Sequence, residues 1–146
     1  MKVFELMKTH VVKTTPEATL RDAVDMMDLY QVSGLPVVND RDELVGVVSE
    51  YDVIQALLPS YVQLGDGGGA APNADLATLI ARVRDTPVAQ AMSSPAVAVD
   101  ENTDVLEAAA IMLQRRFKRL PVTSEGRLVG VISRIDICQA VLEGQF

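Results

Sequence analysis

Residues 32–38 read VSGLPVV and residues 117–123 read FKRLPVT, so a Leu-Pro-Val core occurs twice, 85 positions apart. A second pair of similar stretches follows at a separation of 84 positions, LVGVVSEYD over residues 44–52 and LVGVISRID over residues 128–136. Similar segments in the same order, with one position deleted between them, are the signature of an internal repeat. The chain is therefore predicted to contain two copies of one small structural unit.

Each copy contains the pattern of an amphipathic helix before its Leu-Pro-Val core. Apolar residues recur at i, i+3, i+4 and i+7, which places them on one helix face. They are Leu20, Ala23, Val24 and Met27 in the first copy, and Val105, Ala108, Ala109 and Met112 in the second. Thr15 and Asp100 are the expected N-caps of these helices, with Pro16 at the first helical position of the first copy.

A hairpin and a second helix are predicted to follow. Two β-branched runs are separated by a polar turn in each copy, near 35–38 and 44–48 and near 120–123 and 128–132. The second helix begins at Ser49 or Ser133. It carries an apolar set in each copy, namely Val53, Ile54, Leu57 and Leu58, and Ile137, Cys138, Val141 and Leu142. Cys138, which aligns with Ile54, is expected to be a buried and inert thiol.

These patterns divide the chain into two repeats, residues 1–58 and residues 87–146, joined by a linker over residues 59–86. A single repeat of this size would leave an apolar face exposed, because small units bury little of their surface. We therefore expect the two repeats to pack together about a pseudo-twofold axis. The linker starts with a glycine-rich stretch, residues 65–73, predicted as a flexible loop. A short amphipathic helix follows, with one apolar side formed by Leu76, Leu79, Ile80 and Val83.

The composition narrows the possible functions. A net charge of −7 argues against the capture of nucleic acid through overall charge. Apolar stretches are short, so no membrane span is expected, and the acidic Glu5 comes too early for a signal peptide. The single cysteine excludes an internal disulfide and suits a cytoplasmic location. His10 is the only histidine and has no cysteine or histidine cluster nearby, so we expect neither a zinc site nor a catalytic constellation.

The repeated order of strand, helix, hairpin and helix, with Leu-Pro-Val and Gly-x-x-Ser-x-x-Asp at fixed places, resembles the CBS-domain family. The resemblance covers the chain except residues 59–86. It implies an α/β fold in which two CBS repeats, each β-α-β-β-α, pack about a pseudo-twofold axis into one Bateman module. In this family such modules bind AMP, ADP, ATP or S-adenosylmethionine in clefts between the repeats.

The resemblance also implies which residues bind the ligand at the start of each second helix. Asp52 and Asp136 would bind the ribose hydroxyls, while Ser49 and Ser133 would face phosphate. A helix N-terminus offers free N–H groups and the positive end of the helix dipole to an anion, and a carboxylate can accept hydrogen bonds from two vicinal hydroxyls. The same Ser-x-x-Asp pattern is typical of a capping box. Both interpretations stay open, and the two roles can coexist.

The two copies differ where the phosphate is expected. The second copy has three basic residues there and the first copy has none: Lys118, Arg119 and Arg134 stand against Ser33, Gly34 and Glu50. We therefore predict unequal clefts, with phosphate held by Lys118, Arg119 and Arg134. A basic group of one repeat can reach the cleft of the other, so the assignment of this site to one cleft stays open.

In the family, adenine lies between apolar side chains, and the backbone of the first strand reads its edge. The matching stretches are residues 10–14 and 95–99. The approximate adenine contacts implied by the resemblance are Val12, Val97, Leu35 and Leu120. Val12 and Val97 are equally compatible with a place in the core.

Together these expectations describe a non-catalytic regulatory module that senses an adenine nucleotide and requires no cofactor. Signalling would act in trans on an unidentified regulated protein, and we expect a homodimer that pairs through apolar helix faces. Alternative interpretations are a ligand-free structural or dimerisation module, an S-adenosylmethionine binder, or a nucleic-acid binder that uses the basic residues 115–119. The acidity of the chain argues against nucleic acid.

Overall fold

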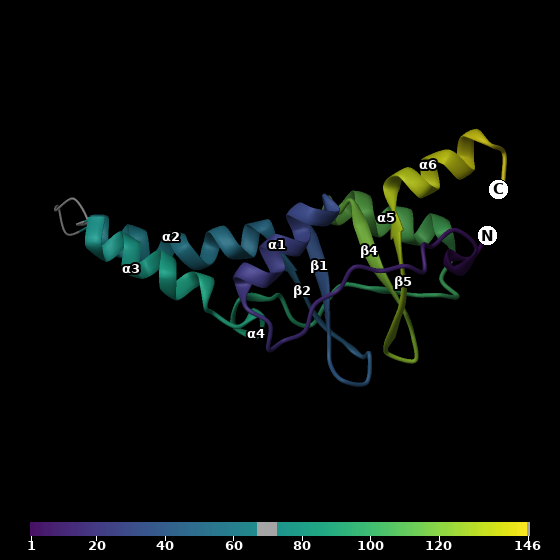
Figure 1. The fold of residues 1–146 in the computed structure, drawn as a ribbon. Coiled ribbons are helices and arrows are strands. Elements are labelled where there is room, and N and C mark those ends of the chain that lie inside the picture. Colours follow the sequence, from purple (N-terminus) through teal and green to yellow (C-terminus); the bar gives the residue numbers. More distant parts are fainter. Residues whose placement is uncertain (67–72, 146) are drawn as a thin grey trace. The chain divides into compact units, whose positions relative to one another are not determined.

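The computed structural model describes residues 1–66 and 73–145, which belong to two compact units (Figure 1). Unit 1 consists of Met1–Val11, Asp40–Leu44 and Ala96–Phe146, and unit 2 consists of Val12–Asn39 and Val45–Pro95. Each unit combines helices with a small sheet, which confirms the predicted α/β class.

Unit 1 contains most of the second repeat. Its elements are η1 (Val3–Glu5), β3 (Val99–Asp100), α5 (Val105–Arg115), β4 (Arg119–Ser124), β5 (Arg127–Ser133) and α6 (Arg134–Leu142). Strands β4 and β5 form an antiparallel hairpin, and β3 pairs in parallel with β4. Helix α5 packs on this sheet through one apolar core, composed of Val3, Val99, Val105, Ala108, Met112, Leu120, Val122, Ile132 and Ile137.

Unit 2 contains most of the first repeat and the insertion. Its elements are α1 (Leu20–Tyr30), β1 (Gly34–Val38), β2 (Leu44–Ser49), α2 (Glu50–Asp66), α3 (Asn73–Arg84) and α4 (Val88–Ala91). Its core is formed by Leu20, Ala23, Met27, Leu35, Val37, Val48 and Val88. Helix α3 confirms the amphipathic helix predicted in the linker, with Leu79 buried. Residues 67–72 of the predicted glycine-rich loop lie outside the described residues.

The expected first strand of each repeat, residues 10–14 and residues 95–99, is shorter than predicted. Within residues 10–14 only Thr14 pairs, through an isolated parallel bridge to Val37. In the second repeat the strand is reduced to the two-residue β3. The two remnants occupy equivalent places, because each pairs with the valine that follows Leu-Pro.

The proline of the Leu-Pro-Val core explains why these strands are short. The Thr14 N–H donates to the Pro36 carbonyl at 3.0 Å, and the Val38 N–H donates to the Thr14 carbonyl at 3.0 Å. A longer parallel ladder would next need a donor from the nitrogen of Pro36, which carries no hydrogen. Pro121 holds the same position in β4 and limits β3 in the same way.

Both first helices begin four residues later than predicted. Helix α1 is capped by Thr19 through a reciprocal capping box, and α5 is capped by Asp104. The expected caps, Thr15 and Asp100, lie one turn earlier, where their carbonyls accept hydrogen bonds that close separate turns. Pro16 lies in the first of these turns and not in the helix. The predicted apolar faces are unaffected, since they depend on spacing and not on the first helical residue.

The N-terminal residues of the chain complete unit 1 by lying against β5. The Lys8 N–H donates to the Val131 carbonyl at 2.8 Å, and the Val131 N–H donates to the Lys8 carbonyl at 2.9 Å. A Cβ atom at Gly130 would lie 2.7 Å from the Met7 sulfur and 2.8 Å from the Lys8 carbonyl oxygen. The close approach of the two backbones therefore requires glycine at position 130.

Unit 2 repeats this arrangement with the residues that precede the second repeat. Ser93 exchanges backbone hydrogen bonds with Val47 at 2.9 and 3.1 Å. Gly46 lies beside Met92, and a Cβ atom at position 46 would be 2.7 Å from the Met92 sulfur. As a result the compact units differ from the sequence repeats. Residues 1–11, which begin the first repeat, belong to unit 1 with most of the second repeat. Residues 87–95, which begin the second repeat, belong to unit 2 with most of the first repeat.

The second helices bury fewer apolar residues than expected. On α6 only one side faces the core, through Ile137 and Ala140. Five residues of the predicted apolar sets are exposed on α2 and α6, namely Ile54, Leu58, Cys138, Val141 and Leu142. The prediction of a buried thiol is therefore wrong: spacing alone groups Cys138 with apolar neighbours, but the helix turns this side away from its own unit.

We expect Leu120→Ala to lower the free energy of unfolding by about 2–5 kcal/mol, because Leu120 is fully buried and its loss leaves a cavity. Leu113→Ala is the matched control: Leu113 is 75% exposed on α5 of the same unit, and its replacement should change the unfolding free energy by less than about 0.5 kcal/mol. Urea denaturation followed by circular dichroism measures both. Equal losses would contradict this assignment of the core.

Candidate functional site

The start of α6 carries a reciprocal serine–aspartate cap at the end of β5. The Ser133 N–H and the Ser133 hydroxyl both donate to Oδ2 of Asp136, at 3.0 and 2.8 Å. In return, the Asp136 N–H donates to Oγ of Ser133 at 3.3 Å. The capping interpretation of the Ser-x-x-Asp pattern is thus confirmed for this helix.

The start of α2 has the same contacts. The Ser49 N–H and hydroxyl donate to Oδ2 of Asp52 at 2.8 and 3.1 Å, and the Asp52 N–H donates to Oγ of Ser49 at 3.3 Å. The duplication is therefore preserved in the hydrogen bonds of the two helix starts as well as in the sequence.

The cap occupies only one oxygen of each carboxylate. For Asp136, the second oxygen, Oδ1, lies 3.8 Å from Nζ of Lys8. Among the described residues, Oδ1 of Asp52 has no hydrogen-bond or ion-pair partner. Since an ionised carboxylate oxygen offers two acceptor lone pairs, each acid retains acceptor capacity for the hydroxyls of a sugar while it caps its helix. Capping and ligand binding are compatible in this geometry.

Lys8 is a residue of this site that the sequence patterns did not indicate. Its side chain is 69% exposed, whereas the Asp136 side chain is 8% exposed. The backbone pairing of Lys8 with Val131 holds it beside the start of α6. The only signal in the sequence was the alignment of Met7 with Met92, which places Lys8 opposite Ser93 but does not show what either residue contacts.

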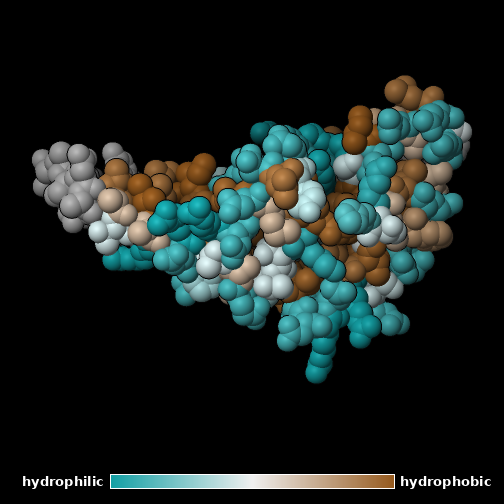
Figure 2. All heavy atoms as spheres, in the orientation of Figure 1, coloured by the Kyte–Doolittle hydropathy of each residue, from teal (hydrophilic) through white to brown (hydrophobic). Residues whose placement is uncertain are grey.

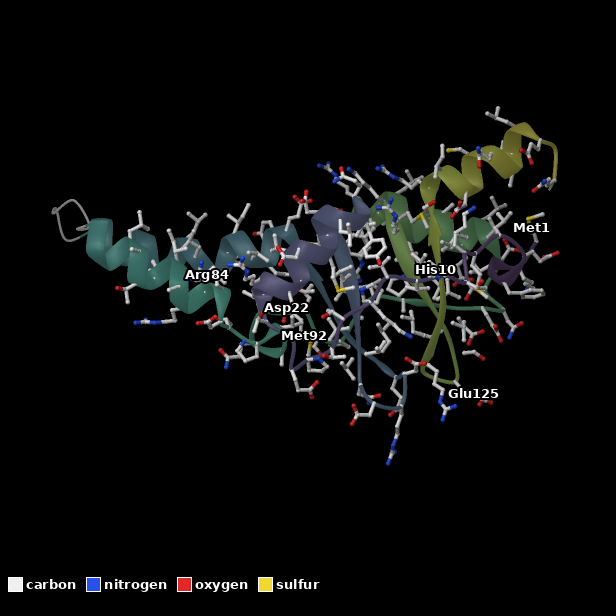
Figure 3. All side chains as sticks on the ribbon, in the orientation of Figure 1. Met1, His10, Asp22, Arg84, Met92 and Glu125 are labelled. Atoms are coloured by element: carbon white, nitrogen blue, oxygen red, sulfur yellow. The ribbon has the colours of Figure 1, made fainter. Side chains whose placement is uncertain are left out.

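The three predicted phosphate residues lie around the start of α6, and all three are exposed. Arg119 pairs with Ser133 across the β4–β5 ladder, and Arg134 directly follows that serine. The Arg134 N–H donates to the Lys118 carbonyl at 2.9 Å, which holds these two residues next to one another. Figure 3 labels Glu125 at the turn of this hairpin, at the opposite end of the strands from the site.

The predicted adenine contacts differ in burial. Val12 and Val97 are partly exposed, so each can contact a ligand at the surface of its unit. Leu35 and Leu120 are fully enclosed in the cores of their units. Both therefore take part in core packing, and their contact with adenine stays a prediction. The adenine contact stays a prediction for Val12 and Val97 as well.

Unit 2 also contains an apolar pocket of about 320 Å³ between α1, α2 and α3. Its lining consists of Leu20, Arg21, Val24, Asp25, Val53, Leu57, Ile80, Val83 and Arg84. None of the predicted ligand residues lines it, and its wall is mostly carbon. It offers few groups that could orient a sugar or a phosphate, so it is distinct from the site at the start of α2.

No helix in the described part of the chain has the length and apolar character needed to cross a membrane. The described residues contain no group of three histidine, cysteine, aspartate or glutamate side chains that could hold a metal ion.

Comparison with known proteins identifies relatives over nearly the whole chain. The family model of the CBS domain matches residues 3–59 and 83–143. The chain is 32% identical over 143 residues to the CBS domain-containing protein CBSX2, chloroplastic, of Arabidopsis thaliana. The match covers 92% of this chain, which spans 59% of the length of that relative.

Solved structures give the same result for the fold. The crystal structure of CBSX2 in complex with AMP has a TM-score of 0.75 at 27% identity, covering 99% of this chain and 98% of that one. The CBS domain pair of protein MJ0100, in complex with 5-methylthioadenosine and S-adenosyl-L-methionine, has a TM-score of 0.68. It covers 100% of this chain and 98% of that one, and at 16% identity this second likeness concerns the fold alone.

We expect Ser133→Ala to lower the free energy of unfolding by about 0.5–2 kcal/mol, because it removes the helix cap and one hydrogen bond to Asp136. Ser124→Ala, at the end of β4, is the control and should cost less than about 0.5 kcal/mol. Urea denaturation gives both values. If Ser133→Ala proves as stable as the control, the cap does not stabilise α6.

Proposed function

Because the chain belongs to the CBS-domain family, we propose that it is a non-catalytic regulatory module that binds an adenine nucleotide. The observation that carries the proposal is the second carboxylate oxygen of Asp52 and of Asp136, which takes no part in the cap that holds each acid at its helix start. The regulatory ligand would be AMP, ADP or ATP, and no cofactor is required.

The chemistry of each helix start suits a nucleoside with a 5′ substituent. The free oxygen of Asp52 or Asp136 would accept hydrogen bonds from the ribose hydroxyls, each contributing about 1.5–3 kcal/mol because the acceptor is charged. Ser49 and Ser133, with the N–H groups that follow them, would face a phosphate at the positive end of the helix dipole. Val12 and Val97 would contact the adenine ring.

The complex of CBSX2 with AMP supports this ligand class, since the crystallised chain is 27% identical to this one and 98% of it is covered by the match. In the proposed role, the nucleotide would bind one arrangement of the module more tightly than another, with a coupling free energy of about 1–3 kcal/mol. A regulated protein would respond to that change. The single cysteine, exposed on α6, fits the reducing conditions of a cytoplasm.

We expect the double variant Asp52→Asn, Asp136→Asn to bind AMP about 10- to 100-fold more weakly, because an amide oxygen is an uncharged and weaker acceptor for the ribose hydroxyls. Isothermal titration calorimetry measures the affinity. Asp85→Asn, which neutralises an exposed acid at the end of α3 outside both helix starts, is the control and should bind AMP as the unmodified protein does. Binding unchanged in the double variant, or no heat with the unmodified protein at millimolar AMP, would refute the proposal.

We also propose that the chain pairs with a second copy through the outer sides of α2 and α6. Figure 2 shows hydrophobic side chains on the surface of α6. Exposed apolar residues occur at equivalent places on the two helices: Tyr51, Ile54 and Leu58 on α2, and Ile135, Cys138 and Leu142 on α6. Apolar surface of this kind favours association, because burial removes it from water.

We expect Ile54→Glu combined with Ile135→Glu to convert the dimer into a monomer, since these two side chains are 57% and 62% exposed and the change would place charge in the apolar contact. Light scattering coupled to size-exclusion chromatography measures the mass. Gln114→Glu, an exposed charge change on α5 and outside the proposed contact, is the control and should remain dimeric. An unmodified protein that is monomeric at all concentrations would contradict the proposal.

A further inference from the structure

The two helix starts share their backbone hydrogen bonds but differ in charge at four matched positions near the capping serine and aspartate. Around Ser133 and Asp136, unit 1 has four cations. Around Ser49 and Asp52, unit 2 has none at the equivalent positions and one additional acid. The matched pairs are Lys8 with Ser93, Lys118 with Ser33, Arg119 with Gly34, and Arg134 with Glu50.

The structure shows that these positions are equivalent in space and not only in sequence. The Arg134 N–H donates to the Lys118 carbonyl at 2.9 Å, and the Glu50 N–H donates to the Ser33 carbonyl at 3.0 Å. The same backbone contact is therefore made at both sites, while Arg134 is replaced by the oppositely charged Glu50 and Lys118 by the uncharged Ser33.

The other two pairs are matched in the same way. Lys8 pairs with Val131 and Ser93 pairs with Val47, each through two backbone hydrogen bonds. Arg119 lies opposite Ser133 in the β4–β5 ladder. Its counterpart Gly34 lies beside Ser49, since an added Cβ would be 3.6 Å from the Cβ of that serine.

The aspartate that would bind the ribose also differs between the two units in its exposure and in the charges near it. Asp136 is 9% exposed and has Lys8 3.8 Å from its free oxygen, so its charge is partly compensated. Asp52 is more exposed, and Glu50, two residues before it, is the first residue of the same helix. A phosphate placed at the start of α6 meets cations of its own unit, whereas at the start of α2 the matched positions offer no cation and Glu50 stands in the place of Arg134.

We propose that the two sites take different classes of adenosine ligand. The site of unit 1 takes an adenosine nucleotide that carries phosphate, with Lys8 as a specificity-determining residue beside Lys118, Arg119 and Arg134. The site of unit 2 takes an adenosine derivative whose 5′ substituent is uncharged or cationic, so Ser49 would face that substituent in place of a phosphate. This inference rests on the proposed function, because it assigns ligand classes to those same two sites.

The experiment uses proteins in which one site is disabled at a time. Asp52→Asn leaves the unit 1 site, and Asp136→Asn leaves the unit 2 site. Each is titrated calorimetrically with AMP and with 5′-methylthioadenosine, two ligands with the same nucleoside and different 5′ charge. We expect AMP to bind the Asp52→Asn protein about tenfold or more tightly than the thioether does, and the order to reverse in the Asp136→Asn protein.

Exchange of the charges provides the second test. Lys8→Ser with Arg134→Glu should abolish the preference of the unit 1 site for AMP, and Ser93→Lys with Glu50→Arg should give the unit 2 site a preference for AMP. All four positions are exposed, so the exchange changes charge without disturbing the core. Arg127→Glu, an exposed charge reversal at the far end of β5, is the control and should leave both preferences unchanged.

The outcomes separate this inference from the proposed function. If the unmodified protein binds neither ligand, the proposed function fails, and the inference fails with it. If the unmodified protein binds adenosine ligands but both single-site variants rank AMP and the thioether in the same order, the proposed function stands and the inference is overturned. If the two single-site variants rank AMP and the thioether in opposite orders, and the charge exchange changes these preferences as expected, the proposed function and the inference are both supported.

Discussion

The reciprocal hydrogen bonds between a serine and the aspartate three residues later are the constraint on which both sites depend. They form where a strand leads directly into a helix: β5 ends at Ser133 and α6 begins at Arg134. At such a junction the first N–H groups of the helix have no partner within the helix. Oγ of Ser133 accepts a hydrogen bond from one of them, the Asp136 N–H, and the carboxylate of Asp136 accepts in return from the Ser133 N–H and hydroxyl and is thereby oriented. The interaction that stabilises the helix start also fixes the group that would bind the ligand.

A second constraint places a distant segment beside each helix start. Gly130 allows the backbone around Lys8 to approach β5 closely, and Gly46 allows the same approach on β2. Because the capping serines end these strands, the approaching segment necessarily runs near the start of the following helix. The lysine side chain reaches Asp136 for this reason. The exchange of leading segments between the repeats is therefore part of the construction of the sites as well as of the fold.

The sequence predicted the parts of the fold that have local signals, and it failed where the determinant lay elsewhere in the chain. The duplication, the hairpins and the starts of the second helices follow from spacing and from Ser-x-x-Asp. The role of Lys8 was missed because its partner lies 128 positions further along the chain, and no local pattern reports such a contact. Cys138 was assigned to the core because spacing identifies a helix face but not what covers it. Leu35 and Leu120, for which the resemblance implied a contact with adenine, are the second residues of β1 and β4 and lie enclosed in the cores of their units, which no local pattern indicates.

The difference in charge between the two sites calls for an explanation other than stability. Lys8 is largely exposed and lies at the long end of ion-pair distance from Asp136, and contacts of this kind contribute about 0–1 kcal/mol to folding. The serine–aspartate caps, by contrast, are required by the helix starts and are the same in both copies. The fold therefore accounts for what the two sites share but not for the cations gathered at only one of them. A ligand that carries phosphate in one unit and lacks it in the other would account for that difference, because the charge of the bound group would then decide which side chains are useful around it.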